Sequence, residues 1–199
     1  RAIAKYGVGV DNIDLEAAKA RGIAVSRTVG ANSEAVADYA MTLMLAVARK
    51  AVLIDRTCRT GSWKKISTID VSHATLGILG LGAIGKNVAK RAQGFDMNVL
   101  AYDVFWDEAY AAEHHITKAT PEEIFRQSDF ISVHLPLMPE TENFIAKEQL
   151  AMMKPNVILV NTARGGLIHE GDLLDALEAG TIYGAGIDAF CEEPPKDER

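Results

Sequence analysis

Three glycines near the middle of the chain have the spacing of a phosphate-binding loop. The sequence from Gly80 to Gly85 fits the pattern G-x-G-x-x-G, with an apolar run before it and helix-like apolar spacing after it. In such a loop the first glycine permits a tight turn, the second lets a pyrophosphate approach the backbone, and the third lets the helix pack on the strand. The helix N-terminus adds free N–H groups and a positive dipole end. We therefore expect a dinucleotide to contact the loop residues Gly80, Gly82, Ala83, Ile84 and Gly85.

An acidic residue follows this loop at the distance that suits a dinucleotide. Asp103 lies 18 residues after Gly85, where the next predicted strand ends, and no Lys or Arg follows it directly. A carboxylate in this place accepts hydrogen bonds from the adenosine ribose and repels a 2′-phosphate. The alternative interpretation is that Asp103 only forms the turn at the end of the strand. The pair of features predicts NAD rather than NADP as the cofactor. It does not specify a reaction.

Segments of strand and helix character alternate along the whole chain, which predicts an α/β fold with a doubly wound, largely parallel sheet. The strands of the main sheet are expected within residues 75–80, 98–102, 130–135, 157–161 and 182–190. One long helix is expected over residues 34–59, with Ser33 as its N-cap and an apolar stripe formed by Val36, Ala40, Leu43, Ala46 and Val47. Residues 105–117 are expected to be irregular, with one or two helical turns.

Composition narrows the classes of protein to which the chain can belong. The formal net charge is −6 and Lys and Arg form no long run, so nucleic acid is a poor candidate partner. Cys58 and Cys191 are the two cysteines and form no C-x-x-C pair, which favours a reduced, cytoplasmic setting and argues against a metal site. No run of 18 apolar residues occurs, so we do not expect a membrane anchor.

Further motifs resemble those of the D-isomer-specific 2-hydroxyacid dehydrogenase family, in family-like order and spacing. The matching segments are residues 6–14, 32–38, 134–137, 161–168 and 184–190, followed by Glu193-Pro194. The sequences of these motifs are most similar to those of phosphoglycerate dehydrogenases and of hydroxypyruvate or glyoxylate reductases. The resemblance implies a remnant of a flavodoxin-like substrate domain over residues 1–29. It also implies an NAD-binding Rossmann domain over 30–190 and the start of a linker over 191–199.

The resemblance also implies roles for individual residues. Arg164 would bind the substrate carboxylate and polarise the 2-oxo group, which suits a permanent cation with a forked donor array. Glu193 would orient a catalytic histidine and raise its pKa. Backbone groups of Val8 and Gly9 would hold the substrate carboxylate, and Asp188 would contact the nicotinamide carboxamide. The cofactor cleft would also be lined by His134, Pro136, Thr162, Ala163 and Arg164, although Pro136 equally fits simple strand termination.

Together these features predict NAD-linked hydride transfer at C2 of a D-2-hydroxy acid or 2-oxo acid, and a homodimer through the helix that starts at Glu34. The family's catalytic histidine would follow the Glu-Pro pair beyond Arg199, and none of the five histidines in the sequence replaces it convincingly. We therefore expect a fragment that binds NADH but does not reduce hydroxypyruvate. Two alternatives stay open, an NAD-sensing corepressor-like protein and a formate-dehydrogenase-like enzyme; Glu193 argues against the second.

Overall fold

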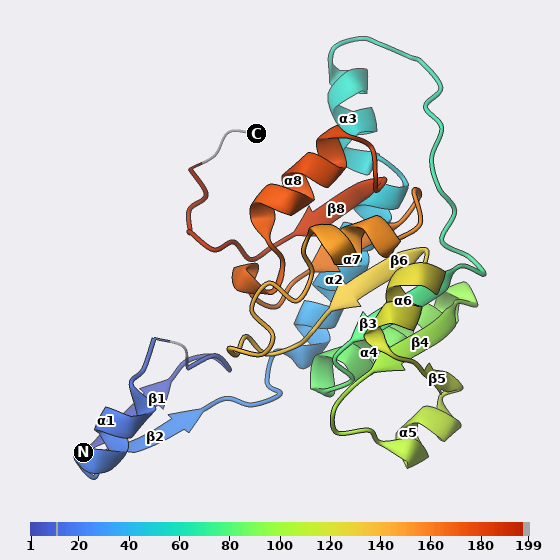
Figure 1. Ribbon diagram of the computed structural model, residues 1–199. Coiled ribbons are helices and arrows are strands. Elements are labelled where there is room, and N and C mark those ends of the chain that lie inside the picture. Colours follow the sequence, from blue (N-terminus) through green and yellow to red (C-terminus); the bar gives the residue numbers. More distant parts are fainter. Residues whose placement is uncertain (11, 197–199) are drawn as a thin grey trace.

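A computed structural model describes residues 1–10 and 12–196 of the 199-residue chain and contains two parallel sheets (Figure 1). The larger sheet has six strands in the order β5-β4-β3-β6-β7-β8, and the smaller pairs β1 with β2. The strands are β1 (Ala2–Lys5), β2 (Ala24–Arg27), β3 (Thr75–Leu79), β4 (Asn98–Tyr102), β5 (Ile116–Lys118), β6 (Phe130–Val133), β7 (Ile158–Asn161) and β8 (Gly184–Ile187). The helices are α1 (Leu15–Ala20), α2 (Ser33–Ala48), α3 (Ala51–Arg59), α4 (Ala83–Ala92), α5 (Glu108–Glu113), α6 (Pro121–Gln127), α7 (Lys147–Met152) and α8 (Glu170–Glu178), with 3-10 turns η1 (Gln93–Phe95) and η2 (Gly165–Leu167).

The strand order creates a switch point in the middle of the six-stranded sheet. From β3 the chain moves outward to β4 and β5, then returns to β6 on the other side of β3 and continues to β7 and β8. Connections that leave neighbouring strands in opposite directions open a crevice at the strands' carboxyl ends. The segments after β3 and β6 flank this crevice. The expected α/β class with a doubly wound parallel sheet is confirmed.

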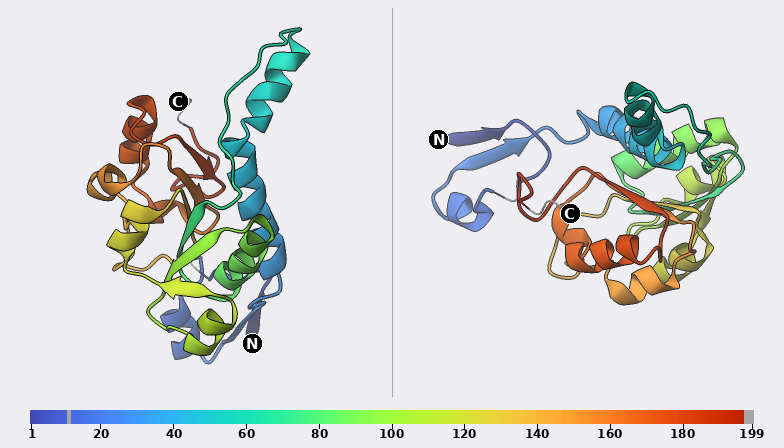
Figure 2. Two further views of the ribbon diagram at one scale, coloured as in Figure 1. Left: turned by 90° about the vertical axis from the view of Figure 1, so that its right-hand side faces the viewer. Right: turned by 90° about the horizontal axis from the view of Figure 1, so that it is seen from above.

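Both faces of the sheet are covered by helices, which explains why its strands read as continuous apolar runs (Figures 1 and 2). Alternate residues point to opposite sides. Ile78 and Val160 join the core under α2 and α4, whereas Leu79 and Leu159 join the core under α6, α7 and α8. All four side chains are fully buried, so the sheet is clamped between two apolar layers.

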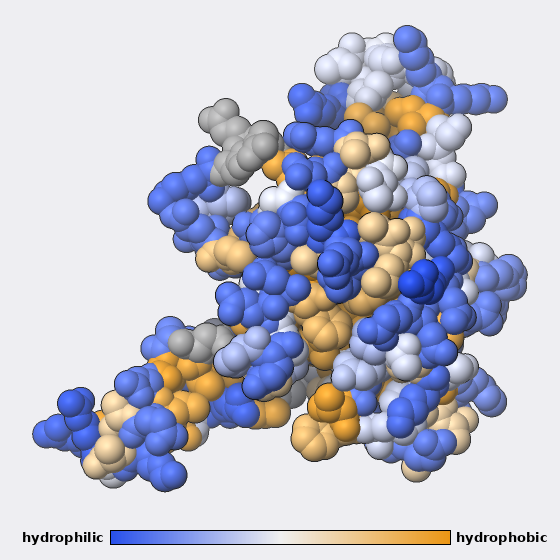
Figure 3. All heavy atoms as spheres, in the orientation of Figure 1, coloured by the Kyte–Doolittle hydropathy of each residue, from blue (hydrophilic) through white to orange (hydrophobic). Residues whose placement is uncertain are grey.

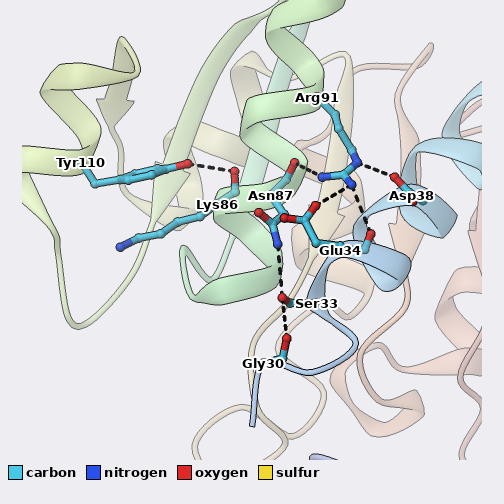
Figure 4. Close-up of polar contacts among 8 residues, drawn as sticks. All are labelled: Gly30, Ser33, Glu34, Asp38, Lys86, Asn87, Arg91 and Tyr110. Atoms are coloured by element: carbon cyan, nitrogen blue, oxygen red, sulfur yellow. Dashed lines mark hydrogen bonds and ion pairs between the residues drawn. The ribbon is translucent and has the colours of Figure 1, made fainter.

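The β1–α1–β2 unit projects from the six-stranded sheet and joins it through a short segment before α2 (Figures 1 and 2). Gly30 in this segment has a φ of +78°, and its carbonyl accepts a hydrogen bond from the Ser33 hydroxyl at 2.9 Å. The side-chain amide of Asn87 on α4 donates to the same hydroxyl at 3.3 Å (Figure 4). These bonds tie the connecting segment to the larger sheet's helix layer.

The start of α2 is further held to α4 by a charged cluster (Figure 4). Arg91 on α4 contacts Glu34 at 2.7 Å and Asp38 at 2.6 Å, and it donates to the Asn87 carbonyl at 3.0 Å. Hydrogen bonding to Glu34 is the largest cause of the raised pKa of Arg91. The cluster therefore joins the first two turns of α2 to the last turn of α4.

The prediction of one helix over residues 34–59 is wrong, because α2 ends at Ala48 and α3 begins at Ala51. Lys50 between them has a left-handed backbone with φ of +49°. Helix α2 packs on the sheet and has six buried residues, whereas no residue of α3 is buried, so the sheet holds α3 less firmly than α2.

Two details of α2 also differ from expectation. Ser33 is the first helical residue, not the cap; Asn32 occupies the N-cap position, without a side-chain capping bond. The buried face lies about one residue further round the helix than the predicted stripe and shares only Ala40 with it; it consists of Ser33, Ala37, Ala40, Met41, Met44 and Ala48. Most residues of the predicted stripe are partly buried at its border instead.

Within residues 105–117, the six-residue α5 agrees with the one or two helical turns that were expected, whereas the start of β5 was not expected. β5 is a three-residue edge strand, and Ile116 is its one buried residue and pairs with Val99 of β4. A strand this short has too little alternation to be recognised in sequence. Its pairing with β4 defines it.

The visible surface is mainly hydrophilic, with apolar patches over α3 and the β1–α1–β2 unit (Figure 3). Val52 and Leu53 of α3 are exposed large apolar residues. In the described part of the chain, every helix is too short or too polar to cross a lipid bilayer.

Candidate functional site

The glycine loop after β3 is shaped by close contacts of its own backbone. Gly80 has a φ of +99°, and a Cβ added there would lie 2.8 Å from the carbonyl carbon of His134. A Cβ on Gly85 would lie 2.1 Å from the Gly80 carbonyl oxygen. A Cβ on Gly82, by contrast, meets no atom within 4 Å. Packing within the chain therefore requires the first and third glycines, whereas the second borders open space at the N-terminus of α4.

The carboxylate of Asp103 ties the end of β4 to this loop. One oxygen accepts the backbone N–H of Leu81 at 2.7 Å, and the other accepts that of Phe105 at 2.8 Å. The carbonyl of Tyr102, the residue before Asp103, accepts the N–H of Gly80 at 2.8 Å. Each carboxylate oxygen has lone pairs for more than one donor, so half-buried Asp103 can also accept from a ribose hydroxyl.

The crevice's other flank is the segment after β6. The Ser132 hydroxyl lies 2.9 Å from Nε2 of His134, and the backbone N–H of His134 donates to the Leu79 carbonyl at 2.7 Å. Burial lowers the pKa of His134 to about 4, so the ring is neutral at pH 7. Its buried Nδ1 has no hydrogen-bond partner among the described residues. Pro136 follows on the surface, and its carbonyl accepts the Thr141 hydroxyl at 2.6 Å.

The loop after β7 carries Arg164 and is organised by Asn161. The Asn161 side chain accepts the N–H of Ala163 at 3.0 Å and donates to the Arg164 carbonyl at 2.8 Å. Nη1 of half-buried Arg164 donates to the Ala163 carbonyl at 2.7 Å. The Thr162 hydroxyl in this loop is buried and has no hydrogen-bond partner in the described chain.

The segment after β8 lies directly against that loop. The N–H of Asp188 donates to the Asn161 carbonyl at 2.9 Å. A Cβ on Gly165 would lie 2.1 Å from the carbonyl carbon of Phe190, so the two backbones touch. Glu193 is exposed, and one of its oxygens accepts the N–H of Phe190 at 3.1 Å. Arg164, Asp188 and Glu193 therefore come from adjoining segments at one edge of the sheet.

Val8 and Gly9 lie elsewhere, in the loop after β1 of the smaller unit. Arg27 of β2 donates to the Val8 carbonyl at 3.4 Å, and Gly7 exchanges hydrogen bonds with Thr28. This loop is therefore held by β2 and sits at the carboxyl end of its own two-stranded sheet. Their proposed contact with a substrate stays a prediction.

The described residues fit a dinucleotide at the crevice. The open space at Gly82 adjoins the helix N-terminus of α4, and Asp103 offers acceptors beside the same loop. At the ends of β6 and β7, the orphaned Nδ1 of His134 and hydroxyl of Thr162 are buried polar atoms that a ligand could satisfy. NAD carries phosphates, hydroxyls and a carboxamide that match these groups in kind.

Sequence reasoning missed the part that Asn161 plays in this site. Its side-chain oxygen accepts the backbone N–H of the residue two positions later, which is the hydrogen bond that defines an Asx turn. An Asn at the end of a buried strand, directly before the loop of Arg164, was the available signal.

Two of the remaining histidines, His114 and His169, make contacts that are structural in kind. His169 accepts the N–H of Asp172 as the cap of α8, and the His114 ring lies 4.1 Å from that of Tyr110. Cys58 and Cys191 are exposed free thiols. Across residues 1–10 and 12–196, no group of three or more His, Cys, Asp or Glu is placed to hold a metal ion.

The family model for the D-isomer specific 2-hydroxyacid dehydrogenase NAD binding domain matches residues 41–199. The chain is 44% identical over 200 residues to a D-3-phosphoglycerate dehydrogenase of Methanocaldococcus jannaschii, covering 99% of this chain and 38% of that protein. It is also 44% identical to a glyoxylate reductase of Korarchaeum cryptofilum, covering 100% of this chain and 62% of the relative. The chain thus spans less than two thirds of the length of these relatives.

Solved structures of the same architecture exist. The TT0316 protein from Thermus thermophilus superposes with a TM-score of 0.93 at 40% identity, over 100% of this chain and 64% of that one. A D-lactate dehydrogenase from Aquifex aeolicus, complexed with NAD and lactic acid, gives a TM-score of 0.91 at 32% identity, over 97% of this chain and 59% of that one.

Proposed function

Since this chain belongs to the D-isomer specific 2-hydroxyacid dehydrogenase family and contains its NAD-binding domain, we propose that it serves NAD-linked oxidation of a D-2-hydroxy acid, or the reverse reduction of a 2-oxo acid. The observation that carries the proposal is the meeting of Arg164 with the segment of Asp188 and Glu193 at the edge of a dinucleotide crevice. Such a reaction needs a cation for the substrate carboxylate, a group that contacts the nicotinamide carboxamide, and a carboxylate that orients the catalytic histidine.

Residues at the ends of different strands are proposed to bind different parts of NAD. Bound NAD supplies hydride acceptance or donation at its nicotinamide ring. The N–H groups that begin α4 hold the pyrophosphate, together with Gly82, Ala83 and Ile84. Asp103 binds the adenosine ribose and excludes a 2′-phosphate. The nicotinamide half is held by Thr162, Ala163 and Asp188, with His134 and Pro136 lining the cleft.

The substrate roles fall to the remaining groups. Arg164 binds the carboxylate and polarises the 2-oxo group, and the backbone of Val8 and Gly9 holds the same carboxylate. One oxygen of Glu193 accepts the N–H of Phe190, which leaves the other to accept a ring N–H of the catalytic histidine that the family resemblance implies. That bond orients the histidine and raises its pKa, so that it can hold the proton exchanged with the substrate oxygen.

The substrate that we propose is of the 3-phosphoglycerate or the hydroxypyruvate and glyoxylate type, in keeping with the names of the relatives. The test incubates 3-phosphohydroxypyruvate, hydroxypyruvate, glyoxylate and pyruvate with NADH and a form of the protein that carries the catalytic histidine implied by the family resemblance, and it monitors NADH absorbance. Arg164→Lys should lose turnover, because a point cation cannot replace the forked donor array, whereas Arg126→Lys on the exposed surface of α6 should not. Saturable NADH binding without reduction of any 2-oxo acid, by the form that carries this histidine, would count against this function.

The partner that we propose is a second copy of the chain, bound through α2 and α3. Val52 and Leu53 of α3 are exposed beside an apolar groove that Leu43 and Val47 of α2 and the edge strand β8 also line. A self-complementary apolar patch is typical of a two-fold homodimer. Analytical ultracentrifugation should show that the unsubstituted chain is a dimer and that Leu53→Glu dissociates it. A monomer of the unsubstituted chain at micromolar concentration would contradict this proposal.

A further inference from the structure

We propose that Asn161 is the positioning residue of the substrate site, because its buried side chain holds Arg164 and its backbone holds Asp188 in one fixed arrangement. The inference rests on the proposed function, which gives Arg164 the substrate carboxylate. It adds a residue that touches neither substrate nor cofactor but determines where the residues that do so lie.

The first half of the argument is the side chain of Asn161. It lies at the end of β7 and is 1% exposed. Its oxygen accepts the N–H of Ala163 at 3.0 Å, and its nitrogen donates to the Arg164 carbonyl at 2.8 Å. One amide group therefore uses both its acceptor and its donor on the backbone of the same loop. This folds residues 162–164 back over the strand end.

The second half is the contact with β8. Asn161 pairs with Ile187 in the parallel register, and its carbonyl accepts the N–H of Asp188 at 2.9 Å. Four residues after Asn161, Gly165 leaves no room between the loop and the backbone of Phe190. The loop of Arg164 therefore cannot shift away from the strand without disturbing the segment that carries Asp188.

Only an amide at position 161 satisfies both partners. Asn161→Ala leaves the Ala163 N–H and the Arg164 carbonyl without their partner, which is costly for backbone groups in a half-buried loop. Asn161→Asp keeps the acceptor for Ala163 but places a carboxylate oxygen against the Arg164 carbonyl, so the loop is pushed away from the strand. Protonation of that carboxyl restores a donor, and burial raises the pKa at which this happens.

The test measures two affinities of the chain separately. NADH is titrated by fluorescence, and oxamate, an unreactive amide analogue of a 2-oxo acid, is then titrated into the NADH complex. Asn161→Asp should weaken oxamate binding at least about tenfold while NADH affinity changes less than about threefold, since a tenfold change corresponds to about 1.4 kcal/mol, the size of one hydrogen bond. Relative to the unsubstituted chain at each pH, oxamate binding should recover as the pH falls toward 5.

The matched control is Ile158→Val, in the same strand but on the side of the α2 and α4 core. It lowers thermal stability by removing a buried methylene and should leave both affinities unchanged. A control variant that weakens oxamate as much as Asn161→Asp does would reduce the effect to general destabilisation and overturn the inference.

A double-mutant cycle identifies Arg164 as the residue through which Asn161 acts. In an Arg164→Ala background, Asn161→Asp should cause no further loss of oxamate affinity. Additive losses would overturn the inference, as would equal losses of NADH and oxamate affinity in the single variant.

Hydrogen exchange supplies a readout that does not depend on any substrate. Peptides spanning residues 162–167 should exchange faster in Asn161→Ala and those of α8 should not; unchanged exchange in both would overturn the inference. If the unsubstituted chain binds NADH but not oxamate, the proposed function fails, and the exchange experiment still decides the role of Asn161.

Discussion

Alanine substitutions at two glycines of the same loop should separate packing from cofactor binding. Gly85→Ala would place a Cβ 2.1 Å from the Gly80 carbonyl oxygen, whereas a Cβ on Gly82 has no neighbour within 4 Å. The backbone of Gly82, with φ of −74° and ψ of −162°, suits any residue. We therefore expect Gly85→Ala to reduce stability and Gly82→Ala to reduce NADH binding with little change in stability.

The magnitudes follow from these distances. Ordinary contact begins at 3.4 Å, so α4 must move about 1.3 Å from the loop to accept the Gly85→Ala methyl group. Overpacking of this kind costs about 1–3 kcal/mol. For a chain of this size the melting temperature then falls by about 3–10 °C. For Gly82→Ala, the reduced entropy of the unfolded chain stabilises by about 0.4–1 kcal/mol, and the weaker N-cap preference of Ala offsets it.

The assay is thermal unfolding by circular dichroism together with an NADH titration for each variant. Gly82→Ala should melt within about 3 °C of the parent chain but bind NADH at least about tenfold more weakly, because its methyl group occupies the path of the pyrophosphate. The reasoning is refuted if Gly82→Ala binds NADH with the parent affinity, since the open space at this glycine would then not be where phosphates bind. It is also refuted if Gly85→Ala is as stable as the parent.

Three further predictions concern charge. The folded-state pKa of His134 is lowered to about 4, so the unfolded chain binds the extra proton first and stability is lost as the pH falls from 6.5 toward 4. The loss is about 2 kcal/mol by pH 5, and urea unfolding should show that His134→Gln removes this part of the pH dependence; an identical pH profile would contradict it. Asp103→Asn should weaken NADH binding about tenfold or more and raise the NADPH-to-NADH affinity ratio in parallel titrations, because it removes the charge that repels a 2′-phosphate; an unchanged ratio would remove Asp103 from cofactor selection. Arg91→Ala should cost about 1–2 kcal/mol in urea unfolding, less at high salt, because Arg91 bridges two carboxylates. Arg59→Ala, which breaks one exposed i,i+4 pair, serves as its control and should have almost no effect.

The glycine loop illustrates what local sequence can predict. Its three glycines, the strand before it and the helix after it follow one another within residues 75–92, so local pattern was enough to place the unit correctly. The helix over 34–59 illustrates the opposite case. Its apolar spacing continues past Lys50, but only the part before Lys50 packs against the sheet, and the helix breaks where that packing ends. Similarly, β5 exists because β4 pairs with it.

The sequence by itself determined the alternation of strands and helices, the glycine loop with its acidic partner, and the family to which these motifs belong. These are properties of spacing along the chain and of residue chemistry, so they can be read without coordinates. Only the tertiary structure decided which strand ends meet. The parallel pairing of β7 with β8 brings Arg164 beside the segment of Asp188 and Glu193, although more than 20 residues separate them in sequence. The side-chain bonds of Asn161 are local to its own loop, but the bond from the Asp188 N–H to the Asn161 carbonyl follows the register of β7 and β8, which local pattern does not specify.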